Sequence, residues 1–250
     1  MKKPRSRLYI SEFNPTGVFV LLVAVAGLLQ FFVITAIAMA AYPGDVVPGK
    51  YSLTQNFFSD LGMMRSHNGD DNYYASFWFN TALTALGVML LPLFGILPWA
   101  GKRDSMSIWF SAICGIVSGL GLIGLGQLPI DTHYIAHHVA LGFWLFPMFA
   151  MAMAFFFGAV KTDDMSIWFL VAGLVAVAAM IVLPLVTGTS NHVINQKIIA
   201  TYGFIWFGFV VWFVARSALV VIRKKDAPPK SLSEQAEDYT TELSRGYRSR

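Results

Sequence analysis

The sequence predicts an all-α membrane protein built as a bundle of six transmembrane helices. Of its 250 residues, 56% are hydrophobic and only 13% are charged, and the mean hydropathy is +0.59. That composition is typical of a polytopic membrane protein. An α-helix needs about 20 apolar residues to cross a bilayer. Stretches of this length use nearly all of the chain, so we expect one membrane domain.

Six stretches are apolar and long enough to be spans. They cover 17–41, 73–99, 106–127, 134–160, 165–187 and 198–222. The first is longer than the roughly 7–15 apolar residues of a signal peptide, so we expect it to remain as a helix. The chain then divides into a basic N-terminus (1–16), a six-helix membrane domain (17–222) and a disordered tail (223–250) of mixed charge.

The distribution of basic residues predicts the orientation in the membrane. Of the 18 Lys and Arg residues, all but Lys50, Arg65 and Lys197 fall on one side, in the termini, in short loops or at the end of the last helix. Because basic residues favour the cytoplasmic side, both termini are expected to be cytoplasmic. The net charge of +4 is then explained by this orientation and does not indicate binding to nucleic acid. We therefore expect a multi-pass protein, in the cell membrane, whose partners are lipids and not nucleic acid.

A repeated heptapeptide suggests an internal duplication. Residues 104–110 recur with one change as 163–169, and the same offset carries His133 onto His192 and His137 onto Gln196. We predict a duplicated hairpin, formed by helices three and four and again by helices five and six. An axis along the membrane normal would relate the two copies. The alternative is that two helices merely begin alike, with a polar cap and an interfacial Trp.

Polar residues gather on the predicted outer side. All five histidines fall there, and the middle of each predicted span lacks Asp, Glu, His and Lys. Proton pumps and ion-coupled carriers normally need ionisable groups near the bilayer midplane. Their absence there points to a function at the outer lipid–water boundary.

The stretch 129–138 offers candidate metal ligands. It contains Asp131 and three histidines, of which His133 and His137 are four residues apart and would share a helical face. With His192 they would supply three ligands and leave one position for water, as in catalytic zinc sites. Zinc would lower the pKa of that water to about 7. Zinc is therefore the cofactor candidate.

A third outer segment, 51–62, has apolar and polar residues at helical spacing. It predicts an amphipathic helix of about three turns that ends at Gly62. The polar side either lies in water or covers the pocket. In the second case Asp60 would act as general base or fourth ligand, with Ser59 beside it as the other candidate catalytic residue.

Further polar residues are expected around this site. They are Asp131, Asn56, His138, Asn195 and Gln196. Asp131 or Asn195 would orient a histidine ligand from behind. Simpler roles are open as well: Asp131 is a good helix N-cap, and His138 can reach the lipid headgroups. A His-x-x-x-His pair with no Glu between is a weak metal motif.

Three short motifs resemble those of a known family. They are Tyr-Pro-Gly at 42–44, Ser-Asp-Leu-Gly at 59–62, and Pro-x-Asp at 129–131 followed by a His pair at 137–138. In order and spacing they resemble the six-helix membrane family catalogued as domain of unknown function nine-nine-eight, over roughly 17–222. The resemblance implies the fold and no established activity. A looser similarity links the chain to the Frag/DRAM/Sfk membrane family, which includes a factor in lipid-anchor remodelling. Gln196-Lys197 replaces that family's Glu-Arg pair.

Two functional hypotheses follow. The first is a metal-dependent hydrolase of lipid esters or amides, by analogy with the ceramidase and progestin-receptor group, which also pairs Ser, Asp and His. The second is a non-catalytic protein that binds a lipid headgroup or a membrane partner, with pH sensitivity from histidine. Haem between two histidines is disfavoured because all histidines lie on one side. The sequence leaves open whether the chain is an enzyme.

Overall fold

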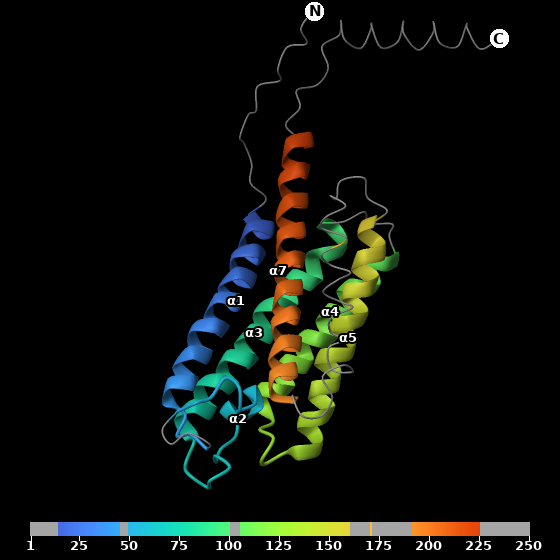
Figure 1. The fold of residues 1–250 in the computed structure, drawn as a ribbon. Helices are drawn as coiled ribbons and strands as arrows, with labels where there is room; N and C mark the ends of the chain where they lie inside the picture. Colours follow the sequence, from blue (N-terminus) through green and yellow to red (C-terminus); the bar gives the residue numbers. More distant parts are fainter. Residues whose placement is uncertain (1–14, 46–49, 101–105, 161–170, 172–191, 226–250) are drawn as a thin grey trace, which may run out of the picture. The chain divides into compact units, whose positions relative to one another are not determined.

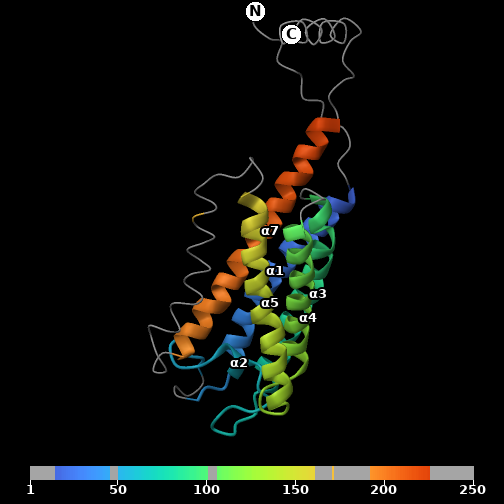
Figure 2. The ribbon, with the colours of Figure 1, turned by 90° about the vertical axis from the view of Figure 1, so that its right-hand side faces the viewer.

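The computed structural model describes residues 15–45, 50–100, 106–160, 171 and 192–225 (Figures 1 and 2). This part of the chain is helical and contains no strand, only an isolated bridge between Arg65 and Asp71. Its helices are α1 (Pro15–Ala41), α2 (Phe58–Leu61), α3 (Tyr73–Ala100), α4 (Met106–Gln127), α5 (Tyr134–Val160) and α7 (His192–Lys225). All except α2 are long and apolar enough to cross a membrane, so the predicted all-α membrane class is confirmed.

Some expectations concern residues outside the described ones. The predicted span 165–187 lies there apart from Val171, as does the second copy of the repeated heptapeptide. The sixth helix, the duplicated hairpin and the cytoplasmic termini therefore stay predictions. The described residues between Pro15 and Ala218 belong to one compact unit.

Close helix contacts in this unit depend on small residues. Helix α4 packs against both α3 and α5. A Cβ on Gly87 of α3 would lie 2.6 Å from the carbonyl oxygen of Gly119 on α4, so only glycine permits this approach. Ser118 Oγ donates to the Trp144 carbonyl at 3.0 Å and links α4 to α5. These contacts hold α3, α4 and α5 against one another near the middle of the helices.

Helix α7 is held by aromatic contacts. Its Phe204 ring lies 4.6 Å from Phe31 of α1, and Trp206 lies 6.3 Å from Phe155 of α5. Such aromatic pairs add stability beyond the area that they bury. At one end of this unit α1 and α4 finish and α3, α5 and α7 begin; α2 lies there too, and we call it the α2 end (Figure 1).

The predicted three-turn amphipathic helix at 51–62 is wrong. The structure has a single turn, α2, because Phe57 is extended (φ −72°, ψ 158°) and interrupts the helix. Its N–H donates to the Asp60 carboxylate at 2.7 Å, and Asn56 Oδ1 accepts from the Ser52 N–H at 3.0 Å. Side chains thus take backbone donors that a continuous helix would use. Asn56 and Asp60 are buried and do not form a stripe in water.

Candidate functional site

A cavity of about 410 Å³ opens at the α2 end, and we call it the polar chamber. Three separate segments line it: the α2 segment and the loop after it, the start of α5 with the loop before it, and α7. The lining residues are Phe57, Ser59, Asp60, Met63, His67, Ile130, Asp131, His137, His138, Leu141 and Gln196. Six of them were singled out from the sequence: Ser59, Asp60, Asp131, His137, His138 and Gln196.

A smaller cavity of about 50 Å³, the apolar chamber, adjoins the first. Most of its wall is made of apolar side chains of the long helices: Phe31, Phe79, Leu83, Leu125, Trp144, Ala200 and Phe204, with Phe58 of α2. Ser59, His137, Leu141 and Gln196 line both cavities. The site therefore has a polar part and an apolar part that share one boundary.

The motif at 59–62 positions Asp60 at this site. The carboxylate accepts the Phe57 N–H at the start of α2, as a helix-capping acid does, and is only 4% exposed. Gly62 anchors the segment to α3, because its carbonyl accepts from Ser76 Oγ at 2.9 Å and Asn80 Nδ2 at 3.0 Å. A Cβ on Gly62 would lie 2.6 Å from Asn80 Oδ1, so a larger residue here would displace the Asn80 side chain that holds this carbonyl.

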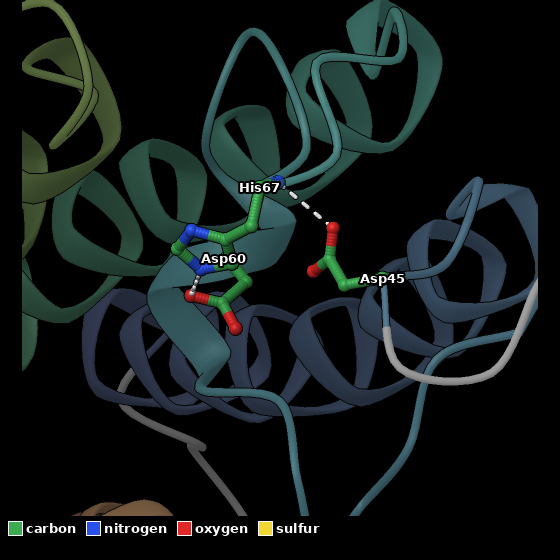
Figure 3. A group of neighbouring side chains, drawn as sticks. All are labelled: Asp45, Asp60 and His67. Atoms are coloured by element: carbon green, nitrogen blue, oxygen red, sulfur yellow. Dashed lines mark hydrogen bonds and ion pairs between the residues drawn. The ribbon is translucent and has the colours of Figure 1, made fainter.

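Asp45, Asp60 and His67 form a cluster that the sequence analysis missed (Figure 3). His67 Nε2 lies 3.3 Å from Asp60 Oδ1, and the His67 backbone N–H donates to Asp45 Oδ1 at 2.8 Å. Asn56 Nδ2 donates to Asp45 Oδ2 at 3.0 Å. A turn at Gly44, whose φ is +86°, precedes Asp45 in the chain. The Tyr-Pro-Gly motif just before Asp45 was the available sequence signal.

This cluster could hold a metal ion, since one ligand atom from each of its members lies within 4.8 Å of the others. Among the described residues it is the group of three or more His, Cys, Asp or Glu with that property. The predicted zinc ligands His133, His137 and His192 do not form such a group. Of these three, His137 lines both chambers, whereas His133 and His192 are exposed and line neither.

Two tyrosines hold the loops that carry the cluster. Tyr42 OH donates to the Asp45 carboxylate, and Tyr51 OH donates to the Phe57 carbonyl at 3.0 Å. Burial raises the pKa of Tyr42, and the neighbouring Asp45 raises that pKa further. Burial also raises the pKa of Tyr51, with a smaller contribution from the Asp60 charge. Both phenols therefore stay protonated and act as donors.

His137 and His138 present acceptor nitrogens. His137 Nδ1 lies 2.7 Å from the Leu128 carbonyl, and His138 Nδ1 lies 2.8 Å from the Tyr134 carbonyl. A carbonyl oxygen only accepts, so each Nδ1 carries a proton and donates it. In the neutral form of either ring, Nε2 is then an acceptor. His137 is 8% exposed and lines both chambers, while His138 is exposed and lines the polar chamber.

Asp131 joins two loops. Its Oδ2 accepts the backbone N–H groups of Met64, at 2.8 Å, and Arg65, at 3.2 Å. The α5 N-cap role considered from the sequence does not fit these bonds, because the carboxylate holds the loop after α2. Asn195, another predicted supporting residue, is buried and lines neither chamber.

Helix α7 holds the α2 segment from a second direction. Gln196 Oε1 accepts the Phe58 N–H at 2.8 Å. Lys197 Nζ donates to the Asn56 carbonyl and lies 5.4 Å from the centre of the Phe58 ring, within cation–π range. Both residues of the Gln-Lys pair near the start of α7 thus hold the α2 segment in place.

Comparison with known proteins places this architecture in a family. The family model described as "Protein of unknown function (DUF998)" matches residues 24–222. No curated protein and no solved structure matches the chain. The matched range includes every residue that lines the two chambers. On this match, which confirms the resemblance seen in the sequence, the chain belongs to the DUF998 family of proteins of unknown function.

Proposed function

We propose that the chain binds an amphiphile of the membrane at the α2 end, with the polar head in the polar chamber and the start of the apolar chain in the apolar chamber. The observation that carries this proposal is the shared boundary, where Ser59, His137, Leu141 and Gln196 line both cavities. Ligand sites are typically cavities of about 300–1,000 Å³ with a few placed polar groups. The polar chamber, at about 410 Å³, is of that size.

The surroundings favour an amphiphile over a small polar solute. The apolar chamber lies among side chains of the membrane-length helices, such as Phe31, Phe79 and Trp144. A freely soluble metabolite would leave those surfaces without a partner. A lipid or a lipid-like molecule matches both parts of the cavity and is present at high concentration beside it.

Filling the apolar chamber should weaken amphiphile binding. Ala200 is 4% exposed and lines that chamber, so Ala200→Leu would occupy its volume of about 50 Å³. We expect the affinity for a single-chain amphiphile to fall about tenfold, since the loss of roughly two buried methylenes costs this much. Native mass spectrometry of the protein released from micelles measures the adducts directly.

The control is Gly208→Leu on the same helix, where an added Cβ meets nothing within 4 Å. It should bind like the wild type. Equal adducts on wild type and Ala200→Leu would contradict the assignment of the chain to this chamber. A wild type that binds no amphiphile at all would contradict the proposed function.

Ester or amide hydrolysis is the second candidate, and one observation favours it. Ser59 and His137 lie at the boundary between the chambers, where the bond between head and chain of such an amphiphile would be. His137 Nε2 is free to take a proton, as a general base must. No hydrogen bond joins Ser59 to His137 among the described residues, so binding remains the leading proposal.

Metal-dependent hydrolysis would need a zinc ion. The cluster of Asp45, Asp60 and His67 is poorly suited to hold one. Each carboxylate oxygen there already accepts a donor of the chain: Asp45 from the His67 N–H, the Tyr42 hydroxyl and Asn56, and Asp60 from His67 and the Phe57 N–H. The cluster is therefore satisfied by hydrogen bonds that tie the loops together.

We accordingly expect the gently purified protein to contain zinc at well below one ion per chain. Elemental analysis measures this content, and chelator treatment should leave amphiphile adducts unchanged. The control is Asp70→Asn, an exposed acid outside the cluster. Stoichiometric zinc that is lost in Asp45→Asn, or chelator-sensitive cleavage of an ester amphiphile, would contradict this expectation and restore the metal-dependent hydrolase.

A further inference from the structure

The polar chamber offers many more hydrogen-bond acceptors than donors. Asp131 contributes a carboxylate with one oxygen unused, and His137 and His138 contribute Nε2 in their neutral forms because each Nδ1 donates to a backbone carbonyl. The Asp60 carboxylate also lines the chamber, and its oxygens accept from His67 and the Phe57 N–H. The donors among its polar side chains are the Ser59 hydroxyl, the His67 ring, whose Nε2 is taken by Asp60, and the Gln196 amide, whose oxygen is taken by the Phe58 N–H. An occupant that complements this wall must bring donors.

Carboxylates dominate the charged side chains of the chamber. No Lys or Arg of the described residues lines it. The nearby cation, Lys197, donates to the Asn56 carbonyl and lies over aromatic rings instead of facing the cavity wall. A phosphate, sulfate or carboxylate head would therefore meet two carboxylates, with His67, which already pairs with Asp60 at 3.3 Å, as the basic side chain beside them. Such an arrangement is unfavourable for an anion in a partly desolvated site.

His137 is a buried residue of the same lining. His137 is 8% exposed, and none of the hydrogen bonds among the described residues uses its Nε2. Asp131 likewise engages both loop N–H groups with Oδ2 alone, which leaves Oδ1 for another donor. An occupant that donates to these two acceptors is favoured, because each then gains a hydrogen-bond partner from the ligand.

From these observations we propose that the polar chamber recognises a protonated primary amine as the head of its ligand. The inference rests on the proposed amphiphile binding and names the chemistry of the head. An ammonium group brings three N–H donors and a positive charge, which match the acceptors and the carboxylates. A quaternary ammonium brings no N–H and is normally held by an aromatic cage. Phe57 is the aromatic residue in this lining, so a quaternary head is not expected.

The test compares amphiphiles that share one chain and differ in the head. Decylamine, decyltrimethylammonium, decyl sulfate and decyl glucoside are added to the full-length protein in neutral detergent micelles, and adducts are counted by native mass spectrometry. We expect decylamine to bind at least about tenfold more tightly than the other three, since a charge-assisted contact is worth about that factor. Propylamine, which has the head without the chain, should bind far more weakly.

The matched variant is Asp131→Asn. An asparagine oxygen can still accept the Met64 and Arg65 N–H groups, so the loops stay in place while the charge is removed. The preference for decylamine over decyl glucoside should fall about tenfold. Asp70→Asn, an exposed acid outside the chamber, should leave the preference unchanged.

Each outcome separates this inference from the proposed function. Decyl sulfate or decyl glucoside binding as tightly as decylamine would overturn the amine assignment and leave amphiphile binding intact. Propylamine binding as tightly as decylamine would support the amine head but point to a soluble ligand, and so overturn the proposed function. An unchanged preference in Asp131→Asn would overturn the role given to this carboxylate and with it the inference.

Discussion

Asp60→Ala should lower the free energy of unfolding by about 3 kcal/mol. The carboxylate is 4% exposed and accepts the Phe57 N–H at 2.7 Å and a contact from His67 at 3.3 Å. Alanine removes the capping hydrogen bond from the Phe57 N–H to a charged group, worth about 1.5–3 kcal/mol, together with the contact to His67. Unfolding in micelles of increasing sodium dodecyl sulfate content, followed by tryptophan fluorescence, measures the change.

Two comparison variants make the measurement specific. Asp60→Asn keeps an oxygen that can accept the Phe57 N–H, so its loss should be about half as large. Asp70→Ala removes an exposed carboxylate and should change stability by less than about 0.5 kcal/mol. If Asp60→Ala unfolds like Asp70→Ala, then Asp60 does not hold the α2 segment, and the polar chamber lacks the support described for it.

The helices were the most predictable part of this chain. The predicted spans 106–127 and 134–160 coincide with α4 and α5, because the hydropathy and length of an apolar stretch are enough to predict a membrane helix. The ends of α7 were less accurate. The predicted span began at 198, whereas α7 begins at His192, because its polar first turn is fixed by contacts with α2 and not by hydropathy.

The sequence predicted which segments meet at the polar site, but not how their side chains are arranged there. Asp60, Asp131 and His137 come from three loops and helix ends that do converge on one chamber. The pairing of His133 with His137 assumed that both lie within the helix, but α5 begins at Tyr134, and His133 is exposed in the turn before it. Helical spacing says nothing about where a helix begins.

Contacts between distant loops explain the remaining errors. Asp45 and His67 meet because of the left-handed turn at Gly44 and the hydrogen bond from the His67 N–H to Asp45, neither of which leaves a periodic pattern. The amphipathic pattern at 51–62 was real, but the Asp60 carboxylate takes the Phe57 N–H and shortens the helix to one turn. Periodicity reports which side of a segment is polar, and tertiary hydrogen bonds decide its conformation.

Gly121→Ala should be as damaging as the loss of Asp60, although it adds only one methyl group. A Cβ at this position of α4 would lie 2.4 Å from the backbone nitrogen of Trp144 on α5. Backbone cannot turn aside as a side chain can, so the two helices must separate. Overpacking of this kind typically costs 1–3 kcal/mol, and we expect about 3 kcal/mol here. The same unfolding assay measures it.

The comparison with Gly95→Ala isolates this packing effect. A Cβ on Gly95 of α3 meets nothing within 4 Å, so this variant gains the roughly 1 kcal/mol helix preference of alanine over glycine without a clash. The difference between the two variants therefore reports the α4–α5 contact alone. Because Trp144 also lines the apolar chamber, Gly121→Ala should weaken amphiphile binding too, whereas Gly95→Ala should not. Equal stability of the two variants would mean that α4 and α5 do not pack at the distance on which the apolar chamber depends.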